Sequence, residues 1–187
     1  MGWEQAHERT AMKKKALYLL WLILFLGGTC GLAQAGSIRV YFSPSGGCTD
    51  AILCEINRAK SEILLQAYSF TSQPIAQALI QAQKRGVRIS AVLDKSNRGR
   101  KYSAATFLKN MGIPVFIDAS HAIAHNKIMI IDNRVVITGS FNFTKAAENK
   151  NAENILILDD LPELTRAYQE NFQQHLRHSV PYRGPEE

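Results

Sequence analysis

The segment 125–142 constrains this chain more than any other. Four apolar residues separate Lys127 from Asp132, which predicts a buried strand with polar groups at both ends. Because side chains alternate between the two faces of a strand, His125 and Lys127 share one face and Asp132 lies on the other. An imidazole and an ammonium are thus expected side by side on a rigid element. Such a pair can attack and neutralise a phosphate.

More polar groups follow the partner strand expected at 135–138. Ser140 and Asn142 come directly after Gly139, and a helix is expected to open at Asn142 and run to residue 147. A hydroxyl, an amide and the first free N–H groups of this helix can converge on one anion. Glu153 begins the next strand, where its carboxylate is expected to accept a hydrogen bond from Nδ1 of the histidine. That bond would fix the tautomer and leave Nε2 free to attack.

Together these residues resemble a known motif. The pattern resembles the HKD motif of the phospholipase D superfamily, without a departure, at His125, Lys127, Asp132, Gly139, Ser140 and Asn142. Glu153 falls where small nucleases of this family place an acidic residue, and the resemblance covers residues 36–178. It implies that His125 attacks phosphorus and forms a covalent phosphohistidine.

The resemblance also implies roles for the other motif residues. The non-bridging oxygens would be held by Lys127, Ser140 and Asn142, and Glu153 would orient the nucleophile. Asp132, on the opposite strand face, is assigned to structural hydrogen bonding. No metal or other cofactor is expected, because the lysine and the helix N-terminus supply the positive charge.

The chain contains the motif once, whereas many superfamily members carry it twice in a longer chain. The chemistry needs two histidines, since one attacks and the other protonates the leaving oxygen and then activates water. A homodimer that brings two copies of His125 to its symmetry axis is the simplest solution. Short, exported, single-motif members of the family are bacterial endonucleases.

Hydrophobic periodicity predicts alternating strands and helices. Strands are expected at 37–43, 62–70, 87–94, 113–117, 125–132, 135–138 and 153–158. Helices are expected at about 50–60, 74–85, 103–110, 142–147 and 161–176, followed by a frayed tail at 181–187. This order predicts one α/β domain, residues 36–187, with a mixed β-sheet flanked by helices on both faces.

The N-terminus is expected to be a signal peptide. Lys13, Lys14 and Lys15 precede an apolar run that ends near an Ala-Gln-Ala site, which predicts cleavage after Ala35. Residues 1–11 would be an extension ahead of a start at Met12. An uncleaved anchor is the alternative, but the run is shorter than the roughly 20 residues that span a bilayer. We expect a periplasmic or secreted protein without stable membrane association after cleavage.

Charge favours a polyanionic partner. The 187 residues carry a net charge of +6, and residues 36–187 retain +4 because the leader holds four basic and two acidic residues. A basic loop after the third expected strand lies where ligands bind in α/β sheets. Its candidate contacts to backbone phosphates are Lys95, Arg98, Arg100 and Lys101.

The cysteines and the remaining histidines give weaker signals. Cys48 and Cys54 could pair in an oxidising compartment or remain free thiols, and both alternatives stay open. No CxxC pattern or Cys/His cluster is present, so no zinc site is expected. His121 is interpreted as an incidental loop histidine.

The sequence therefore predicts an exported, dimeric, metal-independent phosphodiesterase that cuts DNA with little sequence preference, with RNA left open. Two alternatives remain. One is a phospholipid hydrolase or transferase using the same motif. The other is a non-catalytic nucleic-acid-binding subunit of an export or conjugation apparatus.

Overall fold

A computed structural model describes residue 14, residues 36–98 and residues 103–185. From residue 36 onward, the described chain belongs to one compact unit. The expected leader lies, apart from residue 14, outside the described residues, so its cleavage stays a prediction. No helix in the described part of the chain is long and apolar enough to cross a membrane.

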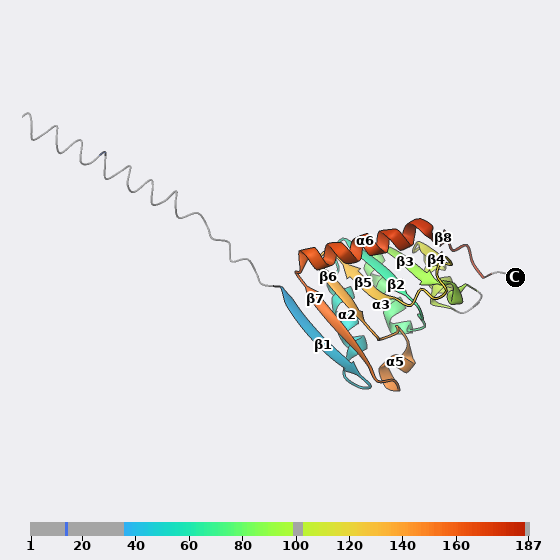
Figure 1. Ribbon diagram of the computed structural model, residues 1–187, viewed down its shortest axis with the longest axis horizontal. Helices are drawn as coiled ribbons and strands as arrows, with labels where there is room; N and C mark the ends of the chain where they lie inside the picture. Colours follow the sequence, from blue (N-terminus) through green and yellow to red (C-terminus); the bar gives the residue numbers. More distant parts are fainter. Residues whose placement is uncertain (1–13, 15–35, 99–102, 186–187) are drawn as a thin grey trace, which may run out of the picture. The chain divides into compact units, whose positions relative to one another are not determined.

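Eight strands form one mixed sheet in the order β1-β7-β6-β5-β2-β3-β4-β8 (Figure 1). The strands are β1 (Ser37–Ser43), β2 (Glu62–Ala67), β3 (Arg88–Asp94), β4 (Val115–Asp118), β5 (Lys127–Ile131), β6 (Val135–Gly139), β7 (Glu153–Asp159) and β8 (Val180–Pro181). The pairs β2–β3 and β3–β4 are parallel. All other neighbours are antiparallel, so the expected mixed sheet is confirmed.

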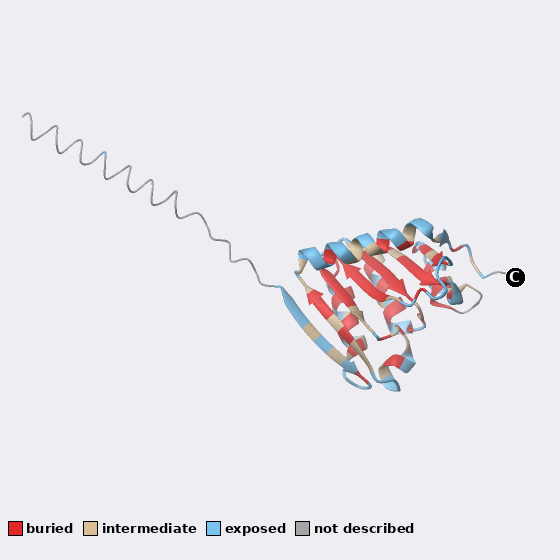
Figure 2. Ribbon diagram, in the orientation of Figure 1, coloured by how far each residue is buried: buried red, intermediate tan, exposed pale blue. Residues whose placement is uncertain are grey.

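Helices cover both faces of this sheet. The structure contains α2 (Cys48–Arg58), α3 (Gln73–Lys84), the 3-10 turn η1 (Lys95–Asn97), α4 (Ala104–Asn110), α5 (Lys145–Asn149) and α6 (Pro162–His178). The larger core joins one sheet face to α2, α3 and α4. The smaller core joins the other face to α6 through Phe172, Tyr168 and Leu176. Figure 2 shows the central strands buried between these layers.

Several boundaries differ from the expected ones. Helix α2 begins at Cys48, after Gly47 with a φ of 79°, and has no side-chain cap at its N-terminus. Helix α5 begins at Lys145, because the Thr144 side chain accepts from the amide of Ala147 and caps it there. The helix expected at Asn142 therefore starts three residues later.

The tail is more ordered than expected. Val180 and Pro181 pair with β4, and Tyr182 is buried. The Tyr182 hydroxyl lies 2.9 Å from the hydroxyl of Thr106. The expectation of a frayed tail was therefore wrong for residues 181 and 182, which strand pairing with β4 and several hydrogen bonds of Tyr182 hold in place.

The two cysteines of the described chain are both free thiols. Cys48 is buried and Cys54 is exposed. Burial, followed by the nearby charge of Glu148, raises the pKa of the Cys48 thiol to about 11. Of the two alternatives, the structure has unpaired thiols.

Several strands end or begin along the same side of the sheet, which is called the carboxyl edge below. The parallel strands β2, β3 and β4 all end there, and β5 begins there because it runs antiparallel to β2. Strand β6 also ends at this edge, and β7 begins there. Ligands of α/β sheets usually bind at the carboxyl ends of the parallel strands.

Candidate active site

The motif residues gather at the carboxyl edge. Lys127 is the first residue of β5, and His125 lies two residues ahead of it. Gly139 ends β6 and pairs with Ile155 of β7. Glu153 stands two residues before Ile155 and therefore points to the same face of β7. The structure thus brings the start of β5 and the start of β7 together across the end of β6.

Lys127 is 6% exposed, and its Nζ donates a hydrogen bond of 2.6 Å to the carbonyl oxygen of His125. Nζ also lies 5.2 Å from the centroid of the Tyr68 ring, within the range of cation–π attraction. Burial lowers the pKa of Lys127, and the negative charge of Glu153 opposes that effect. A buried ammonium with so little compensation favours an incoming anion.

His125 is exposed, in contrast to its neighbour. Its ring lies against Tyr68, with 4.6 Å between the centroids and 51° between the planes. Within the described residues, no hydrogen bond engages either ring nitrogen of His125. Tyr68 follows β2 directly and is a site residue that motif reasoning missed, since nothing in its local sequence sets it apart.

Glu153 is placed differently from the expectation. Its Oε1 accepts a hydrogen bond of 3.1 Å from Nδ2 of Asn151, and among the described residues it forms none with His125. The histidine ring packs on Tyr68 instead, and the carboxylate acts on the site through its charge near Lys127. Glu153 therefore helps to keep the lysine protonated.

Ser140 is held by β7. Its Oγ donates to Oδ1 of Asn154 over 3.3 Å and accepts from the Asn154 amide over 3.1 Å. The amides of Ser140 and Phe141 both donate to the carbonyl oxygen of Asn154. Gly139 allows this close approach, because a Cβ at that position would lie 2.2 Å from the same oxygen.

Asn142 lies between Ser140 and the Thr144 cap. Its carbonyl oxygen accepts from the amide of Thr144 over 2.7 Å. Its side-chain Oδ1 is buried without a hydrogen-bond partner, which is costly unless another group fills the role. This oxygen can accept a hydrogen bond from a bound donor, whereas the Nδ2 amino group of Asn142 is the part that can donate to a phosphate oxygen.

Asp132 lies in the turn between β5 and β6, at the far edge of the sheet from His125. Its carboxylate accepts four hydrogen bonds, from the amides of Lys60, Ser61 and Glu62 and from the Ser61 hydroxyl, over 2.7–3.0 Å. These bonds join the turn to the start of β2. The geometry places Asp132 in the scaffold and away from the other motif side chains.

The basic loop is described in part. Lys95 is exposed, and its Nζ donates to the carbonyl oxygen of His121 over 3.0 Å. Arg98 is half-buried, and its carbonyl oxygen accepts from the Tyr182 hydroxyl. Arg100 and Lys101 lie outside the described residues. Lys95 follows β3 directly and so belongs to the same sheet edge as the motif.

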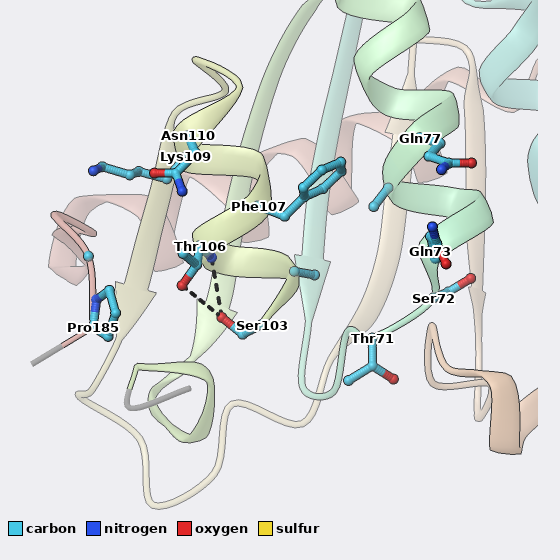
Figure 3. Close-up of a pocket in the computed structure, with 13 residues that line it drawn as sticks. Thr71, Ser72, Gln73, Gln77, Ser103, Thr106, Phe107, Lys109, Asn110 and Pro185 are labelled. Carbon is cyan, nitrogen blue, oxygen red and sulfur yellow. Dashed lines mark hydrogen bonds between the residues drawn. The ribbon is translucent and has the colours of Figure 1, made fainter. Parts of the chain in front are cut away.

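A cavity of about 680 Å³ lies away from the motif. It lies between α3 and α4 and is lined mainly by apolar surface, with Phe107 at its centre (Figure 3). Ser103 at its rim caps α4 by accepting from the amide of Thr106. The candidate chemistry is instead on the open sheet edge.

One cluster was not expected from the sequence. Asp118 at the end of β4 lies within hydrogen-bond distance of His121, His175 and His178. His121, interpreted above as an incidental loop histidine, therefore belongs to a cluster with residues from β4 and α6. The pair His175 and His178, three residues apart at the end of a helix, was the available signal, but its partners are more than 50 residues away in the sequence.

Comparison with known proteins identifies the family. A family model described as "Cardiolipin synthase, PLD-like domain" matches residues 52–176. A phospholipase D of Rickettsia felis is 47% identical over 135 residues, which are 72% of this chain and 67% of the relative. The chain belongs to the phospholipase D superfamily. Its members are generally phosphodiesterases.

Two further matches place this phospholipase D-like chain among its relatives. A mitochondrial cardiolipin hydrolase of Xenopus tropicalis is 33% identical over 66% of this chain and 58% of the relative. The crystal structure of Nuc from Salmonella typhimurium, a phospholipase D family member, aligns with a TM-score of 0.77 at 39% identity. That alignment covers 80% of this chain and 100% of Nuc. The fold is therefore that of the superfamily.

Proposed function

We propose that the chain is a metal-independent phosphodiesterase that cleaves nucleic acid through a phosphohistidine. The observation that carries the proposal is the exposed imidazole of His125, which forms no hydrogen bond with the described residues, together with the buried ammonium of Lys127, which contacts the carbonyl oxygen of the same histidine. An imidazole with a free lone pair is a competent nucleophile. A desolvated cation stabilises charge that develops on the non-bridging oxygens.

The reaction proceeds in two displacements. One ring nitrogen of His125 attacks phosphorus, an N–P bond forms, and the P–O bond to the leaving oxygen breaks. A second histidine gives that oxygen a proton and then removes one from water. The water oxygen attacks phosphorus and releases His125 with the phosphate product. Lys127, Ser140 and Asn142 hold the non-bridging oxygens.

The second histidine comes from a second copy of the chain in this proposal. The sequence holds one motif. His121, His175 and His178 all contact the carboxylate of Asp118, so these three histidines are not available for this role. A two-fold axis near His125 supplies an identical imidazole. The active site is then shared across a homodimer.

Charge supports a nucleic acid substrate. Residues 36–187 carry a net charge of +4, and Lys95 and Arg98 follow β3 at the edge that carries the motif. Contacts from Lys and Arg to backbone phosphates are independent of base sequence. The proposed enzyme therefore cuts with little sequence preference, in the periplasm or outside the cell after removal of residues 1–35.

The test is a cleavage assay with purified protein in excess EDTA. Plasmid DNA and single-stranded RNA should both be offered as substrates, and His125→Ala should abolish cleavage. The stability of the labelled enzyme–substrate adduct in acid and in base then distinguishes a phosphohistidine, which is labile in acid, from other adducts. Loss of cleavage in EDTA below the melting temperature would exclude the metal-independent mechanism. Salt-sensitive DNA binding without cleavage would instead support a non-catalytic binding subunit.

A phospholipid substrate is the second candidate. Ile123, two residues before His125 in the sequence, is 57% exposed, so an apolar side chain close to the nucleophile along the chain is open to contact with a lipid surface. Parallel assays on DNA and on phosphatidylcholine and cardiolipin vesicles separate the two substrates. The Ile123→Ser variant should lose lipid hydrolysis selectively if lipid is the substrate, and should leave DNA cleavage unchanged.

A further inference from the structure

Three histidines and one aspartate converge on the side of the sheet near α6. They come from the end of β4 (Asp118), the loop that follows it (His121) and the end of α6 (His175 and His178). One possible ligand atom from each residue lies within 4.8 Å of the other three. Asp118 is completely buried, and His175 is buried, so half of the cluster is shielded from water.

All three histidines contact the same carboxylate oxygen of Asp118. Oδ2 of Asp118 lies 3.0 Å from Nδ1 of His121, 2.7 Å from Nδ1 of His175 and 3.1 Å from Nε2 of His178. Nδ1 of His121 also lies 3.2 Å from Oδ1, but Oδ2 has two lone pairs and still lies within hydrogen-bond distance of three ring nitrogens. The three rings pack against one another, with centroids 4.8, 5.1 and 5.2 Å apart.

A metal ion resolves this arrangement. Neutral imidazoles then present lone pairs, rather than N–H groups, to a shared centre. Three imidazole nitrogens and one carboxylate oxygen form a donor set that suits Zn²⁺, Co²⁺ or Ni²⁺. Tetrahedral bonds of about 2.0–2.1 Å separate neighbouring ligand atoms by about 3.3 Å. The oxygen–nitrogen distances of 2.7–3.1 Å are shorter than that value by about 0.2–0.6 Å, so a bound ion would need to move the ligand atoms slightly apart.

The surroundings already orient the ligands. The amide of Ser120 donates to Oδ1 of Asp118 over 3.0 Å, which directs Oδ2 toward the histidines. The Ser179 hydroxyl donates to the carbonyl oxygen of His175 over 2.7 Å, which holds the last turn of α6 that carries His175 and His178. The contact from Ser120 to the carboxylate is of the kind that fixes the direction of a ligand in metal sites.

We propose that Asp118, His121, His175 and His178 bind one transition-metal ion of the zinc class. The ion fastens the loop 119–124 to the end of α6. His125 follows that loop directly, and Lys95 contacts it at the His121 carbonyl oxygen. The metal is structural and takes no part in the transfer of phosphate.

The test measures metal binding, so its outcome does not depend on cleavage. The full chain is stripped of metal with EDTA, freed of chelator and titrated with Co²⁺, followed by its visible d–d absorption, and with Zn²⁺ by calorimetry. One ion per chain and the intense bands of a four-coordinate cobalt site are expected. Saturating Zn²⁺ should also raise the melting temperature.

Variants locate the site. His121→Gln and His178→Gln each remove one ligand and should weaken binding by at least about 100-fold. Of the chain's five histidines, His125 is the one within residues 36–187 that lies outside the cluster, so His125→Ala is the control and should bind as the wild type does. His121 is in an exposed loop, so its variant should fold even if a substitution in α6 does not.

Three outcomes would overturn the proposal. The first is the absence of one-to-one binding at micromolar Zn²⁺. The second is unchanged affinity in folded His121→Gln. The third is loss of binding in His125→Ala, which would assign the ion to the phosphodiesterase site. Cleavage of nucleic acid by the metal-free protein at low temperature tests the proposed function and does not test the metal site.

Discussion

Lys127 is an ammonium held in a site that offers it little charge compensation. It is almost fully buried and contacts one carbonyl oxygen and one aromatic face. The fold thus keeps a cation ready in the place where a phosphate would arrive. Binding of the phosphate would return much of the free energy lost when the lysine was desolvated.

The pH dependence of cleavage should report this lysine. Because burial lowers its pKa below the ordinary 10.5, kcat/KM should fall on the alkaline side as the free enzyme loses the Lys127 proton. A bound phosphate raises the pKa of Lys127, so the matching limb in kcat should lie at higher pH. Lys127→Arg should remove both limbs, since guanidinium stays charged, although its rate will be lower. The exposed Lys109→Arg variant is the control, and an alkaline limb that persists in Lys127→Arg would contradict the assignment.

Asp132 should affect stability rather than chemistry. Burial raises the pKa of this carboxyl, but hydrogen bonds from Glu62, Ser61 and Lys60 outweigh it, so the net pKa is lowered. Asp132→Ala should lower the free energy of unfolding at pH 7 by about 1–3 kcal/mol, as expected for lost hydrogen bonds to a charged group. At low temperature its kcat should remain close to that of the wild type.

Because the pKa of Asp132 is lowered in the folded protein, its contribution to stability depends on pH. The carboxylate stabilises the fold fully above its unfolded pKa, and this contribution is lost as pH falls through the folded pKa. The difference in unfolding free energy between wild type and Asp132→Ala should therefore shrink toward low pH. Urea titrations at several pH values measure it, and a difference that grows in acid would contradict the structural role.

At the scale of elements, the junction of β6 and β7 sets the position of Ser140. Gly139→Ala would place a Cβ 2.2 Å from the Asn154 carbonyl oxygen, so the two strands must separate. We expect kcat/KM to fall at least about 10-fold and stability by about 2–4 kcal/mol. Gly86→Ala is the matched control, because Gly86 also has positive φ but open space around it. That variant should cost roughly 1 kcal/mol and leave kinetics unchanged, and equal kinetics in both variants would contradict the idea.

The sequence predicted most elements for identifiable reasons. Strand periodicity predicted the strand that contains Lys127 and separated Lys127 from Asp132, because alternation is a local property, although β5 begins at Lys127 rather than at the expected His125. The cap at Thr144 was missed, since Asn142 offered an equally good start for a helix. The pairing of β8 with β4 and the cluster at Asp118 depend on contacts between distant segments. Local patterns carry no information about such contacts.

At the scale of the whole molecule, the shared site predicts interference between chains. Wild-type protein mixed with about nine-fold excess of His125→Ala, and allowed to exchange, should place only about a tenth of wild-type chains in fully wild-type dimers. Cleavage per wild-type chain should then fall about 10-fold. The control uses the same excess of an unrelated protein, and unchanged activity with confirmed subunit exchange would show that one chain suffices.

The two outer strands of the sheet differ. β8 has two residues, one of them Pro181, which lacks an N–H group. β1 has seven residues, pairs on one side alone within the described chain, and exposes Ile38, Val40 and Phe42. Strand addition is therefore open on one side and blocked on the other. Two chains that joined through β1 would leave no open edge, so such growth would end at two copies and could not continue into a fibre.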